Sequence, residues 1–439
     1  MANAGAAVPE EETVVFPDWV MMDRLSRSHW HNGLDAAREA VNGNKTAVQV
    51  DMDSGHSFYV SFTLAAPPQG GASYLDLHWP LEDSDKSVST YGKPAYPYVR
   101  AIDKDLVLFH VSIPSRTRHR IVPPDLFVYT AAGPSPSVQQ LPLYTKDRRR
   151  RFLVSNFTTG ILRRQDDGYI VADLILYREK EDTGSYSMRA ELCAFNSKSR
   201  KWRVFLKDAP RPQDQSNGGR LPALQATHRV LASEGRFLCW VDYFSGVVLA
   251  DFSDTRPSPP LHFVPFPGEE EYSAEVRAEK CFGERYRSVS ISQGKIGFVH
   301  IDNDLHIGWQ RGQQPRQKIT IWTLNVMDGD SSGFKWEPHR VIDLDRLWVN
   351  NPGIPRYLPE YPVLSADDAD ALCCLLRKQA FHGEASMIMV DMNHASLRSC
   401  TPYINRQSVD VKDHKCESFN VPLLPTAFSK YYLERPSGN

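Results

Sequence analysis

The densest group of charged side chains in the sequence is a run of cations near residue 150. Lys146, Arg148, Arg149, Arg150 and Arg151 place five positive charges within a short stretch. Such a run can bind phosphates or act as a nuclear-import peptide, because clustered Lys and Arg side chains neutralise phosphate charge. A short basic run is also typical of a solvated loop that precedes a strand, and we favour that interpretation.

Histidines and cysteines in the C-terminal part of the chain are potential metal ligands. No two cysteines there have the Cys-x-x-Cys type of spacing that zinc sites use, and Cys373 and Cys374 would point to opposite faces of a strand. His29 and His31 have the spacing of two ligands on one strand face, but the sequence indicates no third ligand. We therefore predict no metal site and no bound cofactor.

Signatures of covalent or acid–base catalysis are missing from the sequence. There is no Gly-x-Ser-x-Gly elbow, no phosphate-binding loop and no dinucleotide fingerprint. The paired carboxylates Asp166-Asp167 and Asp367-Asp368 lie in turn-like contexts, where such residues cap backbone N–H groups. We predict no catalytic residues and expect that the protein is not an enzyme.

Aromatic residues offer a second candidate for molecular recognition. Trp202 and Trp240 lie within strand-like runs and are expected to pack between sheets. Trp348 and Tyr357 lie at the Pro-rich segment 350–362 and are predicted to belong to an exposed loop. Because loops on a rigid β scaffold are common binding surfaces, these two residues are the predicted partner-binding residues.

These side chains must be carried by a scaffold of short strands. Phe237–Val241 and Val247–Ala250 are unbroken apolar runs joined by a loop that ends in Gly246, which is typical of a hairpin covered on both faces. The order of apolar strand, polar turn and returning strand recurs along the chain. Joints rich in the 31 Pro and 26 Gly separate the runs, and only a short helix is expected, at 34–41.

This pattern predicts an all-β protein. Short connections favour antiparallel hairpins, and few helices are available to cross between parallel strands. We predict a β-propeller, or a propeller-like array of roughly five to seven short antiparallel sheets of four strands with few short helices. The alternative is a pair of β-sandwich or barrel domains separated at the linker-like segment 210–219.

The two ends of the chain are expected to behave differently. Residues 1–12 are small and acidic and are predicted to be disordered, whereas 13–439 are predicted to form a single propeller-like domain. The tail 420–439 carries apolar residues that can dock on the body, or close a ring by adding a strand to the first blade. Residues 371–378 have features of both a helix and a strand, and we favour a strand because the run is short.

Charge and composition narrow the environment in which the protein acts. The formal net charge is -2, which gives no global attraction to nucleic acid or anionic membranes. No apolar run approaches the roughly 18 residues of a membrane helix, and the N-terminus lacks the features of a secretory signal. Seven cysteines without such a signal indicate reduced thiols. We expect a protein of the cytoplasm, the nucleus or both, without membrane association.

Several segments, taken together, resemble a plant family that is expanded in grasses and catalogued as domain of unknown function 1618. The similar segments are Phe16–Asp23, Leu126–Tyr129, Leu238–Asp242, Tyr361–Asp370 and Ile388–Met392. The resemblance implies a plant origin and a fold similar to the propeller-like domains found behind F-boxes, although too few residues precede Phe16 for an F-box. The family brings no established activity, ligand or site.

We therefore predict a non-enzymatic scaffold that binds a protein partner on one face of a β array. The first alternative is an enzyme whose site lies in the central channel of a propeller, which would require converging His, Asp and Glu side chains. The second alternative is a nuclear or nucleic-acid-associated protein that uses the basic run 146–151, although the charge balance disfavours nucleic acid as a partner. The sequence does not identify the partner or the oligomeric state.

Overall fold

The computed structural model describes residues 16–67, 72–81, 96–112, 124–144, 153, 155–182, 184–210, 227–253, 258–268, 272, 280–303, 318–327, 333–379, 382–403 and 423–432. The segment 1–12, for which disorder was predicted, lies outside these residues.

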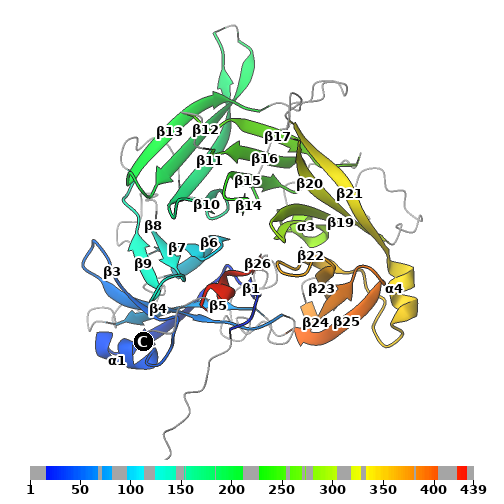
Figure 1. The fold of residues 1–439 in the computed structure, drawn as a ribbon, viewed down its shortest axis with the longest axis horizontal. Helices are drawn as coiled ribbons and strands as arrows, with labels where there is room; N and C mark the ends of the chain where they lie inside the picture. The colour runs from blue at the N-terminus through cyan, green and yellow to red at the C-terminus, as the bar shows by residue number, and fades with distance from the viewer. Residues whose placement is uncertain are drawn as a thin grey trace, which may run out of the picture.

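Within the described residues, six four-stranded sheets, here called blades 1 to 6, stand around a common axis (Figure 1). Blade 1 contains, in spatial order, β2 (Arg27–His31), β5 (Tyr74–Pro80), β4 (Ser57–Thr63) and β3 (Val48–Asp51). Blade 2 contains β6 (Tyr96–Asp103), β7 (Leu106–Ser112), β8 (Asp125–Thr130) and β9 (Ser137–Gln140). Blade 3 contains β10 (Thr159–Arg163), β11 (Tyr169–Lys180), β12 (Tyr186–Asn196) and β13 (Lys201–Asp208).

Blade 4 contains β14 (Arg229–Ser233), β15 (Phe237–Asp242), β16 (Gly246–Asp251) and β17 (Leu261–Pro265). Blade 5 contains β18 (Arg287–Ser292), β19 (Lys295–Ile301), β20 (Lys318–Met327) and β21 (Gly333–Asp343). Blade 6 contains β22 (Glu360–Leu364), β23 (Ala371–Gln379), β24 (His382–Asp391) and β25 (Ser396–Tyr403). The prediction of an all-β, propeller-like fold is confirmed. The described sheets do not form the two β-sandwich or barrel domains of the alternative prediction.

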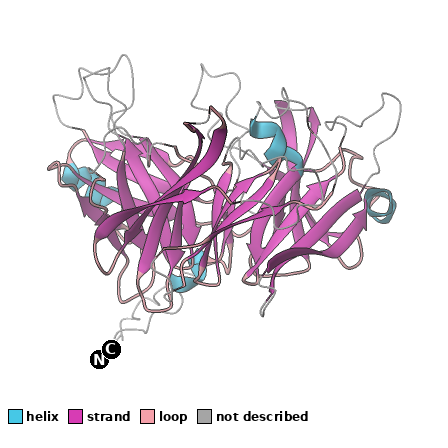
Figure 2. Ribbon diagram, turned by 90° about the horizontal axis from the view of Figure 1, so that it is seen from above, coloured by secondary structure: helices cyan, strands magenta, loops and turns pink. Residues whose placement is uncertain are grey.

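Short helices supplement the blades, and strands make up most of the body (Figure 2). They are α1 (Leu34–Ala40), α3 (Lys280–Tyr286), α4 (Leu344–Asn350) and the 3-10 helix η3 (Phe428–Tyr432). The predicted helix at 34–41 is confirmed as α1, and the predicted strand at 371–378 is confirmed as β23. None of the described helices has the length and apolar character needed to cross a lipid bilayer.

The hairpin of β15 and β16 shows why the apolar runs of this sequence form blades. Both strands are buried along their whole length, as the absence of polar alternation predicted. Asp242 starts the turn, where its carboxylate accepts a hydrogen bond from the backbone N–H of Phe244 at 3.0 Å. At Gly246 a Cβ atom would lie 2.4 Å from the carbonyl oxygen of Val264, so the approach of β17 requires glycine there.

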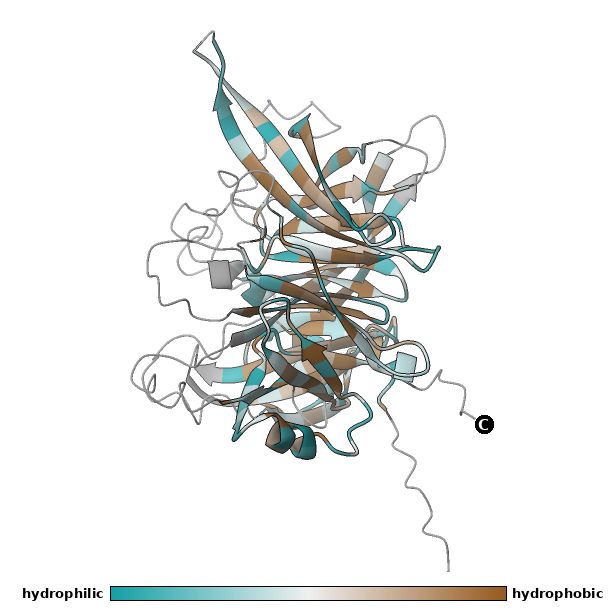
Figure 3. Ribbon diagram, turned by 90° about the vertical axis from the view of Figure 1, so that its left-hand side faces the viewer, coloured by the Kyte–Doolittle hydropathy of each residue, from teal (hydrophilic) through white to brown (hydrophobic). Residues whose placement is uncertain are grey.

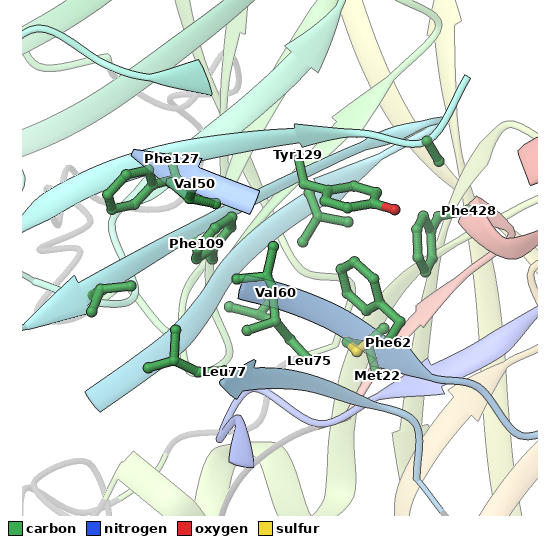
Figure 4. Packing of buried hydrophobic residues seen from close by; sticks show 14 of the residues in the cluster. Met22, Val50, Val60, Phe62, Leu75, Leu77, Phe109, Phe127, Tyr129 and Phe428 are labelled. Atoms are coloured by element: carbon green, nitrogen blue, oxygen red, sulfur yellow. The ribbon is translucent and has the colours of Figure 1, made fainter. Parts of the chain in front are cut away.

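Each junction between neighbouring blades is filled, within the described residues, by an apolar cluster. One large buried member of each cluster, in order from the junction of blades 1 and 2, is Phe109, Phe195, Trp240, Phe298, Leu372 and, at the junction of blade 6 with the N-terminal segment, Met21. Burial of one such side chain is worth about 1.5–3 kcal/mol, so these junctions hold the blades in a ring. Figure 4 shows the first of them, where Val60 and Leu77 of blade 1 pack toward Phe109 and Phe127 of blade 2.

The ring is closed by segments from the two ends of the chain. Within a separate two-stranded sheet, β1 (Val20–Met22) pairs antiparallel with β26 (Leu424–Thr426). Next to this sheet, Phe428 packs 4.9 Å from Phe62, measured between ring centroids, in the first junction cluster (Figure 4). The hydroxyl groups of Tyr129 and Tyr432 are hydrogen-bonded at 2.7 Å. The tail therefore docks on blades 1 and 2 and pairs with β1, rather than adding a strand to a four-stranded blade.

Trp348 corrects one prediction from the sequence. It does not belong to an exposed loop: it lies on α4, is 4% exposed, and packs in the cluster between blades 5 and 6 with Leu344 and Leu347. The sequence interpretation missed α4 because the helix has only two turns and begins at a cap, where the side chain of Asp343 accepts a hydrogen bond from the Arg346 N–H.

Candidate functional site

The residues predicted from the sequence to contact a partner do not form one site in the described part of the molecule. Lys146, Arg148, Arg149, Arg150 and Arg151 lie outside the described residues. Trp348 is buried and so cannot offer its ring to a partner. Tyr357 does lie in the loop that follows α4, but it is partly buried.

The described residues instead bring charged side chains together where the inner strands of the blades meet. Arg229, Arg287 and Glu360 are the first residues of β14, β18 and β22, and all three are buried. Strand β14 contacts β6, β10 and β18, so these inner strands surround the axis seen in Figure 1. The axial cluster, as named here, consists of Asp23, Arg24, Tyr98, Arg229, Tyr243, Glu284, Arg285, Arg287, Glu360, Tyr361 and Arg377.

On the blade 6 side of the axial cluster, one carboxylate holds two arginines. Glu360 accepts a hydrogen bond from Nε of Arg285 at 2.7 Å through one oxygen, and from Nε of Arg377 at 2.9 Å through the other. The Arg377 guanidinium also lies 5.3 Å from the centroid of the Tyr361 ring. Because both oxygens of Glu360 are engaged by cations, this carboxylate is not placed to act as a general base.

Tyr361 is held in an unusual backbone conformation. Its φ is +51°, in the left-handed region, and the ladder between β22 and β23 shifts register between Glu360 and Val363. Left-handed backbone costs a non-glycine residue of order 1–3 kcal/mol and persists where the surroundings impose it. The bulge aims Tyr361 at Arg377, and burial raises the pKa of its hydroxyl group.

Two further arginines, on different blades, are each held by a hydrogen bond from Nε to a histidine ring. Nε of Arg287 donates to Nδ1 of His300 at 3.1 Å, and Nε of Arg100 donates to Nδ1 of His110 at 3.0 Å. Each histidine accepts through Nδ1, so its neutral ring carries the proton on Nε2. Burial, reinforced by Arg100, lowers the pKa of His110 to about 3, which keeps that ring neutral. These arginines are structural links between strands.

Arg24, between β1 and β2, differs from the other arginines. It is 0% exposed, yet none of its three guanidinium nitrogens has a hydrogen-bond partner among the described residues. Its guanidinium carbon lies 5.4 Å from the centroid of the Phe157 ring. Nε of Arg229, a side chain that is 2% exposed, also lacks a partner in the described part of the chain.

Arg24 and Arg229 influence one another although Arg24 lies between β1 and β2 and Arg229 begins β14 of blade 4. Burial lowers the pKa of Arg229; Tyr243 opposes this change, and the positive charge of Arg24 adds to it. Glu284 on α3 also acts on Arg229, whereas burial raises the pKa of Asp23 to about 7 and so weakens its charge near neutral pH. Positive charge therefore exceeds negative charge in the axial cluster.

The polar face of blade 1 supplies partners that the sequence did not reveal for His29 and His31. His31 Nε2 lies 3.2 Å from Nδ1 of His78, and His29 Nε2 lies 2.9 Å from Oδ1 of Asp76. The His29 and His31 rings stack on His78 with centroid distances of 4.9 and 5.3 Å. No group of His, Cys, Asp and Glu in the described residues is placed to hold a metal ion.

A serine also touches this face. Ser61 Oγ lies 3.1 Å from Nε2 of His78, whose pKa burial lowers to about 4, with a further contribution from His29. The pair resembles a nucleophile and its base, but Ser61 is buried and has no exposed side-chain surface for a substrate. For Asp76, burial would raise the pKa, but hydrogen bonds from His29, Arg27 and Thr63 prevail and lower it to about 2. This network stabilises blade 1.

A groove on the surface between blades 3 and 4 combines apolar and cationic side chains. Its volume is about 270 Å³, and Phe205 and Phe252 contribute apolar surface to its lining. Arg164, Lys201 and Arg203 line the same groove, and no carboxylate is among its lining residues in the described part of the chain. No ion pair among the described residues involves Lys201 or Arg203, so these two cations are available to a partner.

The corresponding groove between blades 5 and 6 has a different charge. Its volume is about 380 Å³, and its lining includes one cation, Lys295, and one carboxylate, Glu337, besides neutral polar residues. The two grooves occupy the same kind of position in the ring. Only the groove between blades 3 and 4, of the two, carries an excess of positive charge; it is called the basic groove below.

The comparisons with known proteins agree in part with the resemblance found in the sequence. Residues 240–373 match the model of a family described as "Protein of unknown function (DUF1618)". The match runs from β15 to β23 and so covers parts of blades 4 and 6 and all of blade 5. No curated protein matches the chain.

Three solved structures that are similar to this chain have low sequence identity and low TM-scores. An inulosucrase from Halalkalicoccus jeotgali bound to kestose has 10% identity and a TM-score of 0.29, over 74% of this chain and 86% of that chain. The WD40 domain of SCAP from fission yeast has 10% identity and a TM-score of 0.28, over 89% of each chain. A mutant of the NanB sialidase from Streptococcus pneumoniae has 9% identity and a TM-score of 0.22, over 79% and 80%. The chain thus carries a segment similar to a family of unknown function.

Proposed function

We propose that this protein is a non-enzymatic interaction scaffold, and that its basic groove binds an acidic, extended segment of a partner protein. The observation that carries the proposal is the set of three cations, Arg164, Lys201 and Arg203, in a groove without a lining carboxylate in the described residues. Exposed cations beside apolar surface attract acidic partners and suppress basic ones. We further propose that the whole chain belongs to the plant family that it resembles.

The position of the groove favours an extended partner segment. Strand β13 supplies Lys201, Arg203 and Phe205, and it is the last strand of the blade 3 sheet among the described strands. An outermost strand presents backbone N–H and C=O groups to which another strand can pair. Cations on this strand oppose pairing with a second copy of itself, because like charges would face each other, and they favour a strand that carries Asp or Glu.

The hairpin of β11 and β12 adds a projecting surface beside the groove. Its outer part extends beyond the body of the molecule, with a hydrophilic tip (Figure 3). Tyr186 begins β12 and is 64% exposed, on the strand face that Ala194 also occupies at the groove. Exposed aromatic side chains dominate many interfaces, because they bury a large area at a small cost in conformational entropy.

The test is binding of a fluorescent peptide in which Glu alternates with Val, measured by anisotropy at two salt concentrations. We expect the double variant Lys201→Glu, Arg203→Glu to weaken binding at least tenfold, because it reverses two charges in the groove. Lys295→Glu, in the groove between blades 5 and 6, is the matched control and should bind as the unmodified protein does. Binding that is unaffected by the double variant, or equally lost in the control, would contradict the proposal.

The same three proteins can be used for affinity purification from a plant extract. A partner that is retained by the unmodified protein and by Lys295→Glu, and lost with the double variant, is the expected result. A variant that lacks the basic run 146–151 tests the alternative in which this run makes the contact. If only this deletion, and not the double variant, loses the partner, binding belongs to the run and not to the basic groove.

A further inference from the structure

Arg24 and Arg229 present an energetic problem that the chain does not solve by itself in the described residues. Burying a charged group without a partner is unfavourable, and buried arginines therefore donate to carboxylates, carbonyl oxygens or neutral histidine rings. Arg100, Arg287 and Arg377 follow this rule through their Nε atoms. Among the described residues, Arg24 has no hydrogen-bond partner for any of its side-chain nitrogens, and Arg229 has none for Nε.

In the described part of the chain, no acceptor meets the N–H groups of Arg24 with hydrogen-bond geometry. The Phe157 ring lies 5.4 Å from the guanidinium carbon, and a ring face binds a cation without accepting its N–H groups in line. Tyr98 packs in T-shaped geometry on Phe157. Burial raises the pKa of the Tyr98 hydroxyl group, and Arg24 opposes this through its charge and a side-chain hydrogen-bonding contribution, although no hydrogen bond of normal geometry joins the two among the described residues. The planar fork of N–H donors is the group with which arginine recognises oxyanions.

Arg229 offers a second donor in the same charge cluster. Its Nη1 donates weakly to the Val289 carbonyl oxygen at 3.3 Å, while its Nε has no partner among the described residues. The two cations act on each other, so a negative group between them would relieve their repulsion and use their free donors. Tyr243, which also interacts with both arginines, brings a hydroxyl group to the same cluster.

We propose that Arg24 and Arg229 bind the oxyanion group of a small molecule at the axis of the propeller. The ligand is compact, because both arginine side chains are buried, and its oxyanion is a phosphate or a carboxylate, the two groups that match a guanidinium fork. This axial anion site is separate from the basic groove and does not depend on a protein partner.

The test compares the thermal unfolding of the full chain in inorganic phosphate, in succinate and in sodium chloride at equal ionic strength. We expect phosphate or succinate to raise Tm by at least about 2 °C more than chloride does, because a ligand that binds only the folded state stabilises it. The anion with the larger shift identifies the source of the oxyanion. If neither anion exceeds chloride, the proposal is wrong and water satisfies these donors.

The variant Arg24→Met distinguishes a ligand site from a structural role. Methionine has a similar length and no charge, so the ligand-free variant is expected to have an unchanged or higher Tm and to lose the anion-dependent shift. A structural arginine would instead give a lower Tm without ligand and leave the anion response intact, which would overturn the proposal. Arg356→Met, at an exposed arginine outside the cluster, is the control and should keep the shift.

Two further variants keep the test decisive if Arg24→Met does not fold. Arg24→Lys keeps the charge but lacks the fork of donors, and we expect an at least tenfold weaker response to the preferred anion. The double variant Lys201→Glu, Arg203→Glu changes the basic groove alone and should respond to the anion as the unmodified protein does. Loss of the response in this double variant would show that the anion binds in the groove and not at the axis.

Discussion

The axial cluster and the basic groove contain the same kinds of cations in opposite environments. At the groove, Lys201 and Arg203 are exposed to water, which solvates their charges without a protein partner. At the axis, Arg24 and Arg229 are buried, and each unpaired donor costs free energy. The same type of side chain therefore has different effects in the two places. An exposed cation attracts an acidic partner, whereas a buried cation needs an acceptor for its N–H groups.

The same contrast applies to the carboxylates. Near the groove, an exposed Asp166 has its pKa lowered, first by a hydrogen bond from Lys198. At the axis, burial raises the pKa of Asp23 to about 7 even though its carboxylate accepts a hydrogen bond from the Leu25 N–H. Desolvation and pairing shift a carboxyl pKa in opposite directions, and the balance of the two decides the result: desolvation prevails at Asp23, whereas pairing prevails at Asp166.

The largest effect is expected at the carboxylate that anchors two arginines of the axis. Glu360→Gln keeps the shape of the side chain but removes the negative charge that Arg285 and Arg377 share, so the free energy of unfolding should fall by about 3–5 kcal/mol. Urea denaturation measures this change. Asp368→Asn, which removes one of the two carboxylates that pair with the more exposed Arg398, is the matched control and should cost at most about 1 kcal/mol. Similar losses of stability in both variants would contradict the conclusion that the buried ion pairs of the axis contribute more than exposed pairs.

A smaller effect is expected from Asp23→Asn, and it depends on pH. The pKa of Asp23 is higher in the folded protein than its usual value of 3.8, so between about pH 4 and pH 7 the folded state binds more protons than the unfolded state. The stability of the unmodified protein should therefore fall as pH rises through this window.

Asparagine can still accept the Leu25 N–H bond and does not ionise, so the variant should lose part of this fall. Urea midpoints for both proteins at pH 5 and pH 8 measure the effect. We expect similar midpoints at pH 5 and a higher midpoint for Asp23→Asn at pH 8. A parallel dependence on pH in the two proteins would show that Asp23 does not carry the effect.

The smallest effect on stability is expected at the basic groove. The double variant Lys201→Ala, Arg203→Ala removes two exposed cations, and each change should alter the free energy of unfolding by no more than about 0.5 kcal/mol. The same variant should weaken binding of the acidic peptide. A loss of stability comparable to that of Glu360→Gln would mean that these cations support the fold and not a partner.

Local pattern made much of the fold predictable from the sequence. The hairpin of β15 and β16 was predicted because two apolar runs flank a turn that ends at Gly246, and each of these signals lies within a few residues of the others. The same reasoning identified α1 and β23. Trp348 was misjudged because an apolar residue beside prolines can be exposed or buried, and the packing of α4 between blades 5 and 6 decides which.

The axial cluster was not predictable by the same means. Arg24, Arg229 and Glu284 are far apart in the sequence, and none belongs to a motif with a characteristic spacing. They meet because six blades close into a ring, and β1 must pair with β26 for that closure. His29 and His31 likewise gained His78 and Asp76 as neighbours through the parallel pairing of β2 with β5, which no local signal indicates.

The sequence by itself determined that this protein is built of short antiparallel strands, because alternation, turn residues and apolar runs act over a few neighbouring positions. Only the tertiary structure decided which cations are exposed in the basic groove and which are buried at the axis. Burial depends on contacts between residues that are distant in the sequence, and with burial come the cost of an unpaired charge and the need for a ligand.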